Sequence, residues 1–187
     1  MAMPQKSDSH EARILEDCQK SIEYRFREPA LLRTALTHSS AVALTGGESN
    51  ERLEFLGDAI LGQVITEYLF KRFPLYDEGK LTAFRSHVVD DDTCARISNR
   101  LKMGDYLFTG NGLTFNPAKH MNLLGNAFEA LVAAIHFDGG PDAAKAFILK
   151  NLNPEIEQEA ERVARADQRP AVGGSSCPGA QLGISGK

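Results

Sequence analysis

The segment from Asn50 to Phe73, NERLEFLGDAILGQVITEYLFKRF, constrains the fold more than any other part of the chain. Its apolar residues recur on almost every side of a helix, which is typical of a helix at the centre of a domain. Pro74 ends the pattern because proline cannot continue the backbone hydrogen bonding of a helix. Gly57 and Gly62 each lower helix propensity by roughly 1 kcal/mol relative to alanine. We therefore expect a neighbouring helix or a ligand to approach closely at these glycines.

The remaining segments also favour helices. Strand-like alternation of apolar and polar residues is nearly absent, and several stretches instead have helical periodicity. These stretches are residues 12–22 after a cap at Ser9, 29–40, 80–101, 122–137 and 141–152. Residues 43–50 and 111–121 are predicted to be connectors because they are rich in glycine and polar residues. The predicted fold class is therefore all-α.

One domain is predicted, flanked by loose ends. Residues 1–10 are polar and predicted to be flexible, and residues 11–162 carry the helical patterns. Residues 163–187 are rich in glycine, serine and proline, so we expect a disordered tail.

Composition narrows the functional classes only a little. The net charge of −4 is not the strongly basic balance that announces a nucleic-acid partner, although it permits local basic patches. The 3 cysteines have neither disulfide-framework nor zinc-ligand spacing, which favours reduced thiols. No signal peptide and no segment of membrane-spanning length is evident, so a cytoplasmic protein without a membrane partner is expected.

Two helices carry oxygen-bearing pairs among apolar residues. Glu54 and Asp58 are spaced by four and share one helix face, and Asn126 and Glu129, spaced by three, do the same on the second helix. Two such apolar helices would pack together and bring the four side chains to one place. Three buried negative charges are untenable without a cation. An all-oxygen set of ligands favours Mg²⁺, with Mn²⁺ as a possible substitute.

Two other interpretations compete with a magnesium site. An acidic pair on one helix face is more often solvated surface, but both segments are too apolar for that. A carboxylate-bridged di-iron bundle would need Glu-x-x-His pairs. Neither helix has one, and His136 lies roughly opposite Glu129 on its helix.

Four segments resemble motifs of the ribonuclease III family, whose members cut double-stranded RNA. NERLEFLGDAIL closely resembles the family's signature segment, and LLGNAFEALVAAIHFDGG resembles its second acidic motif. LLRTALTHSS and EGKLTAFRSHVV resemble two further motifs. The resemblance covers about residues 15–152, and the twelve-residue signature is specific.

The resemblance implies an all-helical, homodimeric endoribonuclease domain with one metal-dependent site per subunit. The expected reaction is hydrolysis of double-stranded RNA to 5′-phosphate and 3′-hydroxyl ends in rRNA or mRNA processing. Because two sites would cut opposite strands, short 3′ overhangs are expected.

The family's acidic positions fall on Glu54, Asp58 and Glu129. The resemblance implies that Glu54, Asn126 and Glu129 hold the metal, and that Asp58 and Glu129 position the attacking water. Asn126 is a departure, since this position is normally aspartate; its amide oxygen can bind Mg²⁺ but adds no charge.

Further residues have weaker assignments. Glu51 and Glu78 fall on family positions linked with site support and RNA contact, although both also suit a helix start. His38 is either a general base or, as we favour, a helix-terminal histidine bonded to nearby backbone or carboxylate. Candidates for phosphate contact, which are as individuals more typical of ordinary surface charges, are Arg85, Arg96, Arg100, Lys102, Lys119 and His120.

The dimer interface and the C-terminus leave alternatives open. Phe55 and Leu56 either project into a partner subunit or pack in the core. Many family members continue into a double-stranded-RNA-binding domain, for which the tail of this chain is too short. A minimal member, a shortened chain and a disrupted reading frame all fit. The rival function is a non-catalytic double-stranded-RNA-binding or ribosome-associated protein, which Asn126 favours.

Overall fold

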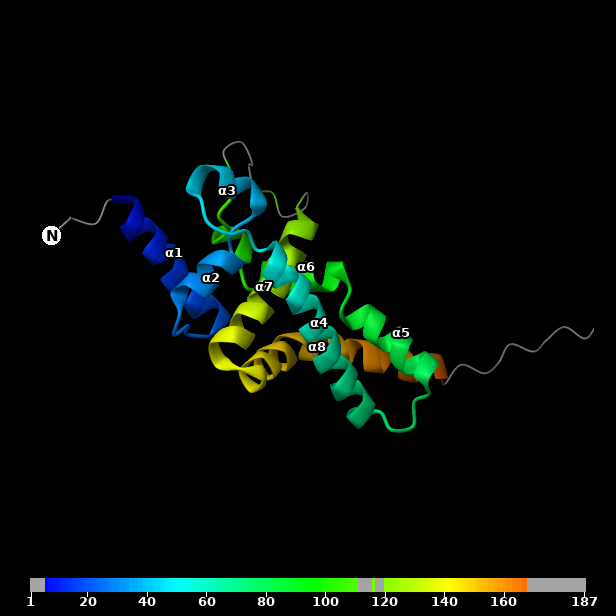
Figure 1. The fold of residues 1–187 in the computed structure, drawn as a ribbon. Helices are drawn as coiled ribbons and strands as arrows, with labels where there is room; N and C mark the ends of the chain where they lie inside the picture. Colours follow the sequence, from blue (N-terminus) through cyan, green and yellow to red (C-terminus); the bar gives the residue numbers. More distant parts are fainter. Residues whose placement is uncertain (1–5, 111–115, 117–119, 168–187) are drawn as a thin grey trace, which may run out of the picture.

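The protein is a bundle of helices (Figure 1), seen in a computed structural model that describes residues 6–110, 116 and 120–167. The elements are α1 (Lys6–Ile22), α2 (Pro29–Ala35), α3 (Ser39–Thr45), α4 (Glu51–Arg72), α5 (Glu78–Val88), α6 (Asp91–Arg100), the 3₁₀ turn η1 (Met103–Asp105), α7 (Met121–Gly139) and α8 (Pro141–Asp167). Within these residues an isolated bridge between Thr37 and Phe108 is the only strand-like pairing. The all-α prediction is confirmed.

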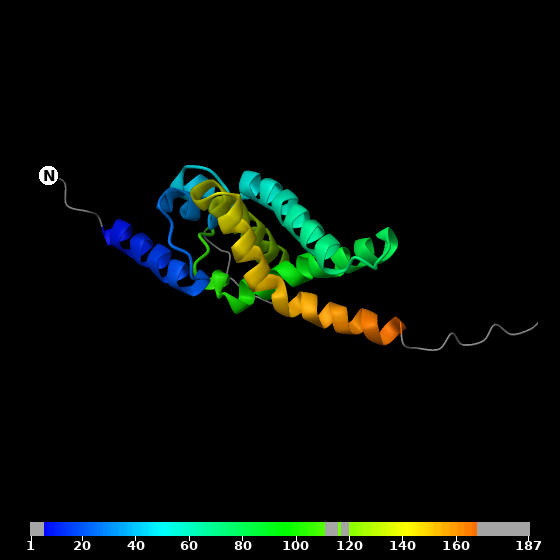
Figure 2. The same ribbon diagram turned by 90° about the horizontal axis from the view of Figure 1, so that it is seen from below.

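Helix α7 is the centre of the core. Every residue from Ala130 to Ile135 is fully buried, and α4, α6, α2 and α8 all pack against this helix. Helix α4 lies on the outer side of α7, as Figure 2 shows. Its inner face is buried through Leu61, Ile65 and Leu69. The prediction that α4 is buried on every side is therefore wrong for the single chain.

Two predicted helices have other boundaries because tertiary contacts compete with local periodicity. Residues 29–40 divide into α2 and α3, since Leu36 and His38 exchange backbone hydrogen bonds with Phe108 at 2.9 and 3.0 Å. Residues 80–101 divide at Asp90, whose carboxylate accepts a hydrogen bond from the Thr93 amide at 2.7 Å and caps α6. Asp and Asn are preferred at this capping position.

The two ends of the chain also differ from the predicted boundaries. Helix α1 begins at Lys6, ahead of the Ser9 cap. Helix α8 continues through Pro154 to Asp167, where buried Ile156 and Glu159 anchor its second half. The predicted tail lies outside the described residues from 168 onward. Within the described part of the chain, no helix has the length and apolar character that crossing a membrane requires.

Gly57 is the point of closest approach between α4 and α7. A Cβ atom at this position would lie 1.8 Å from the backbone oxygen of Glu129, far inside contact distance. The expectation of a close neighbour is therefore confirmed at Gly57. At Gly62 none of the residues that the structure describes lies within 4 Å of a Cβ atom, so no described neighbour requires glycine there.

These two glycines make a matched test of the packing. We predict that Gly57→Ala lowers the free energy of unfolding by about 3 kcal/mol or more, because the new methyl group forces the helices apart. Gly62→Ala is expected to raise it by up to about 1 kcal/mol through helix propensity. Urea unfolding followed by circular dichroism measures both. Similar values for the two variants would contradict the close α4–α7 contact.

Candidate active site

The close contact at Gly57 brings the two oxygen-bearing pairs together. Glu54 and Asp58 lie on α4, and Asn126 and Glu129 lie on the facing stretch of α7. The Asn126 amide donates a hydrogen bond to the Glu54 carboxylate, which joins the two helices directly. Glu54, Asn126 and Glu129 are half-buried, whereas Asp58 is exposed to solvent. The convergence expected from the helix spacing is thus present.

Burial and, after it, repulsion between carboxylates determine the electrostatics of this cluster. Burial, and then the charges of Asp58, Glu54 and Asp91, raise the pKa of Glu129 to about 7. Burial also raises the pKa of Glu54, with a further rise from Glu51 and Asp91 and an opposing effect of the Asn126 hydrogen bond. A bound cation would relieve this repulsion, because it lowers the energy of the ionised forms.

Asp91 is a member of the cluster that the sequence analysis missed. It is the first residue of α6, and its charge reaches Glu54 on α4 and Glu129 on α7. The run Asp90-Asp91-Asp92 was visible in the sequence. In sequence it is indistinguishable from the acidic first turn that any helix favours. Its position against α7 follows only from the packing of α6.

Cys94 lies on the inner side of the cluster and is not part of its chemistry. Burial raises the pKa of the Cys94 thiol, and the nearby charge of Glu129 raises it further, so the thiol stays protonated. Cys18 and Cys94 are both free and buried, as expected for reduced cysteines. Cys177 lies outside the described residues.

Two of the four supporting residues lie near the cluster. The charge of Glu51 acts on Glu54, and Glu51 itself accepts a hydrogen bond from the Ser49 hydroxyl at 3.0 Å. Arg85 on α5 lines a groove between α4 and α5 together with Asp58. This arrangement gives the groove one positive group beside the acids.

The other two supporting residues lie elsewhere. Glu78, in the first turn of α5, accepts a hydrogen bond from the Thr82 hydroxyl at 3.0 Å. It borders an apolar groove that adjoins the groove at Asp58, since Arg85 lines both. His38 caps α3, where its Nδ1 atom accepts a hydrogen bond from the Ser40 amide at 3.2 Å. The helix-terminal interpretation of His38 agrees with this contact.

The remaining basic candidates differ in how free they are to bind phosphate. Arg100 is held by Glu155 at 2.9 Å and donates to the backbone oxygen of Asn151. His120 accepts a hydrogen bond from the Asn116 amide at 3.0 Å, Lys102 is exposed, and Lys119 lies outside the described residues.

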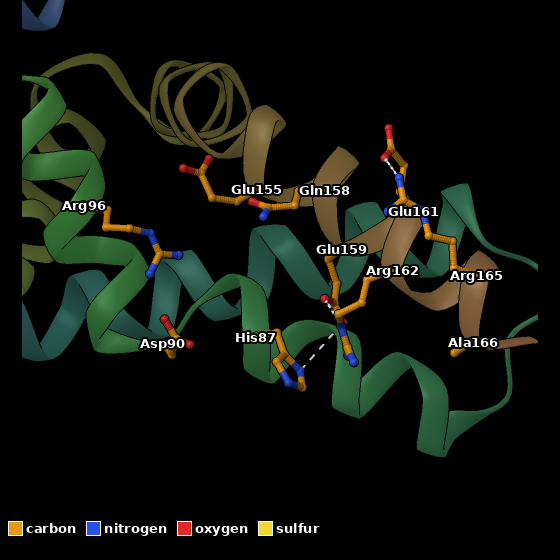
Figure 3. A pocket seen from close by; sticks show the side chains of 10 residues that line it. All are labelled: His87, Asp90, Arg96, Glu155, Gln158, Glu159, Glu161, Arg162, Arg165 and Ala166. Carbon is orange, nitrogen blue, oxygen red and sulfur yellow. Dashed lines mark hydrogen bonds and ion pairs between the residues drawn. The ribbon is translucent and has the colours of Figure 1, made fainter.

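Arg96 lines a groove of mixed charge between α5, α6 and α8 (Figure 3). In this groove Arg162 donates to both carboxylate oxygens of Glu159 at 2.6 Å. His87 lies 3.7 Å from the same carboxylate. Since its acids and bases largely pair with one another, this groove lacks the charge repulsion of the α4–α7 cluster.

The cluster fits a hard divalent cation by the chemistry of its donors. Three carboxylates and one amide supply only oxygen atoms, which Mg²⁺ and Mn²⁺ prefer. Within residues 6–110, 116 and 120–167, no three acidic, histidine or cysteine side chains are drawn together closely enough to enclose an ion. Ionised carboxylates separate when no cation lies between them, so the chemical fit rests on donor type and charge.

Comparison with known proteins identifies the family. The sequence model of the ribonuclease-III-like family matches residues 28–156, which include both acidic pairs and most of the helical bundle. The chain belongs to the ribonuclease-III-like family. The resemblance inferred from the four sequence motifs is thereby confirmed.

Individual ribonuclease III proteins match over most of the chain. Ribonuclease 3 of Methylococcus capsulatus is 45% identical over 135 residues, which cover 72% of this chain and 57% of that protein. Ribonuclease 3 of Rhodopirellula baltica is 39% identical over 149 residues, covering 78% and 56%. The chain thus spans little more than half the length of these curated relatives.

The fold agrees with solved structures of the family. The nuclease domain of ribonuclease III from Campylobacter jejuni superposes with a TM-score of 0.69 at 37% identity, covering 75% of this chain and 96% of that one. Dicer from Pichia stipitis gives a TM-score of 0.55 at 27% identity, covering 71% and 57%. The described helices are therefore those of a ribonuclease III nuclease domain.

The repulsion around Glu129 predicts how stability depends on pH without metal. Because the folded-state pKa is raised to about 7, ionisation of Glu129 destabilises the fold as pH rises from the ordinary pKa of glutamate through 7. We predict that Glu129→Gln, in EDTA, raises stability at pH 8 by on the order of 1 kcal/mol, discounted for partial exposure, and has little effect at pH 5.

Thermal melts at the two pH values measure this difference. Ala160→Gly is a control for general changes in stability, since it lies on α8 and should act equally at both pH values. A loss of stability at pH 8 in Glu129→Gln would show that the carboxyl is structural, and would contradict its place in a repulsive cluster.

Proposed function

We propose that this chain is the catalytic domain, residues 11–162, of a metal-dependent endoribonuclease that hydrolyses double-stranded RNA. The observation that carries the proposal is that Glu54 and Asp58 on α4 face Asn126 and Glu129 on α7, within the residues that the ribonuclease-III-like family model matches. Products with 5′-phosphate and 3′-hydroxyl ends are expected, from duplex segments of rRNA and mRNA precursors in the cytoplasm.

The proposed roles follow from burial and position. The half-buried oxygens of Glu54, Asn126 and Glu129 would hold Mg²⁺, or Mn²⁺ as a substitute. When bound, such an ion supplies charge stabilisation at the phosphoryl oxygens and helps the leaving 3′ oxygen. Asp58, the exposed member, orients the attacking water by accepting its hydrogen bond. Glu129 is proposed to help Asp58 position this water in addition to holding the ion.

The groove beside Asp58 offers a path for the RNA backbone. Arg85 projects from α5 toward α4, with its Nη1 atom 3.4 Å from the Thr66 hydroxyl, and lines the same groove as Asp58. A guanidinium in the same groove as Asp58 can neutralise a phosphate that enters this groove. Recognition of A-form RNA through shape and phosphates requires no base-specific contact here.

Asn126 supports the rival function, a double-stranded-RNA-binding or ribosome-associated protein without catalysis. The acids themselves argue against it. Glu54 and Glu129 carry raised pKa values, so their charges destabilise the folded chain. A protein that no longer binds metal would gain stability by losing these charges, and this chain keeps all three carboxylates.

The cleavage reaction itself distinguishes the two functions. We predict that the chain cleaves a long RNA duplex in Mg²⁺ but not in EDTA, and leaves single-stranded RNA largely intact. Glu129→Gln should reduce the rate by at least 10³-fold, the order expected for loss of a group in metal-assisted hydrolysis. Binding of the duplex without any Mg²⁺-dependent cleavage would favour the non-catalytic function.

We also propose that the chain forms a homodimer through the outer face of α4. Phe55, near the N-terminal end of α4 and outside the groove that Asp58 and Arg85 line, is 82% exposed. Large aromatic side chains so open to water mark an interaction surface. Leu56 packs against the core instead, which supports the alternative that it is a core residue. Dimer formation is named for the Campylobacter jejuni nuclease domain, which supports a second copy as the occupant.

A pair of phenylalanines tests the dimer. We predict that Phe55→Ser weakens self-association about ten-fold or more, because an interface aromatic at a well-packed position is a typical hot spot. Phe137→Ser is the control, since Phe137 is 59% exposed at the far end of α7. Sedimentation velocity over a concentration series measures both. Equal effects of the two substitutions would contradict an interface at Phe55.

A further inference from the structure

Asn126 leaves the proposed metal site one negative charge short of a site with aspartate at that position. We propose that Asp91 supplies this charge, as an outer carboxylate that strengthens cation binding without replacing Asn126 as a ligand. The inference rests on the proposed function, because it concerns the same cation. It adds a third helix, α6, to a site that the sequence motifs place on α4 and α7 alone.

The backbone places Asp91 beside the residues in question. The first turn of α6 packs directly on α7 at Gly125, where a Cβ atom would lie 3.3 Å from the Asp91 backbone oxygen and 3.8 Å from the Cys94 Cβ atom. Gly125 immediately precedes Asn126 and lies about one helical turn before Glu129. The absence of a side chain at Gly125 therefore lets α6 bring an acidic first turn to the edge of the cluster.

Asp91 differs from its two acidic neighbours. Its backbone oxygen lies against Gly125, next to Asn126, and its charge contributes to the raised pKa values of both Glu54 and Glu129. The Asp90 carboxylate is occupied as the cap of α6 and borders the groove of Figure 3 with Arg96. Asp92 is exposed in the same first turn. Position, and not composition, singles out Asp91.

The Asp91 charge is available to a cation. Among the described residues no lysine, arginine or histidine forms an ion pair with it, in contrast to Glu155 and Glu159 on α8. Asp91 is exposed, so a hydrated cation can reach its carboxylate. Mg²⁺ keeps several of its waters in protein sites, and a carboxylate beyond ligand distance can accept hydrogen bonds from them. An outer carboxylate thus stabilises the ion without joining its ligands.

The competing explanation is that Asp91 merely stabilises the start of α6 through the helix dipole. Asp92 shares that role, since both are acidic residues of the first turn of the same helix. Asp92→Asn is therefore a control with the same charge change on the same helix. A dipole effect would change the melting temperature of both variants in the absence of metal. The proposed effect would change only the Mg²⁺ dependence of the melting temperature, and only in Asp91→Asn.

The test is a Mg²⁺ titration of the melting temperature of the full chain, with isothermal calorimetry of MgCl₂ binding as a second readout. Binding to the folded state raises the melting temperature by mass action. We expect Asp91→Asn to raise the half-saturating Mg²⁺ concentration about five-fold, as for one charge acting on a divalent ion at a partly solvated distance. Asp92→Asn should change it less than about two-fold.

Two further variants keep the inference falsifiable if Asp91→Asn is unstable. Asp91→Glu retains the charge and should stay within about two-fold of the parent protein. The double variant Asp91→Asn with Asn126→Asp moves the charge back to the inner position and should recover or exceed the parent affinity. Failure of the double variant to recover affinity would overturn the compensation.

The measurements distinguish an error in the proposed function from an error in the proposed role of Asp91. If the parent protein shows neither Mg²⁺-dependent stabilisation nor cleavage of duplex RNA, the proposed function itself is wrong. If the parent responds to Mg²⁺ and Asp91→Asn responds with the same half-saturation as Asp92→Asn, only the role of Asp91 is overturned.

Discussion

The backbone contact between α4 and α7 at Gly57 is the constraint on which the rest of the site depends. With a Cβ position 1.8 Å from the Glu129 backbone oxygen, no other residue lets the two helices come so close. That proximity allows Asn126 to donate to Glu54 across the interface. It also holds Glu129 near Asp58, where burial and repulsion raise its pKa to about 7. Close packing and charge repulsion are thus two consequences of one contact.

Charge repulsion of this kind lowers the stability of the metal-free chain but favours the binding of a cation. Each ionised carboxylate destabilises the chain in the absence of a cation, and each strengthens binding when a cation is present. In the proposed site, Asn126 would reduce the first effect at the inner position, and Asp91 would restore charge at an exposed position, where solvent screens its repulsion with Glu54 and Glu129. Such a distribution of charge would relax the conflict between folding and metal binding.

Helix α4 has two apolar faces, and only one of them is used within the chain. Leu61, Ile65 and Leu69 face the core, while Phe55 and Phe70 face solvent. This division explains why the helix is apolar nearly all round its axis. The acidic pair lies between the two faces, beside α7 on one side and beside the exposed aromatics on the other. A second copy on the outer face would therefore lie close to the site of the first.

The sequence by itself determined the fold class, the family and the four oxygen side chains from α4 and α7. The fold class and the shared faces of the oxygen side chains follow from local spacing, because residues three or four apart share a helix face whatever the rest of the chain does. The family follows instead from the resemblance of four motifs. Sequence alone also indicated a close approach at Gly57, since glycine in a helix is unfavourable without such a reason.

Only the tertiary structure decided which helix breaks were real and which acid of the 90–92 run reaches the site. The break between α2 and α3 depends on backbone bonds to Phe108, about seventy residues away. The place of Asp91 depends on the packing of α6 against Gly125. Both are long-range contacts, and local periodicity carries no information about partners so distant in the chain.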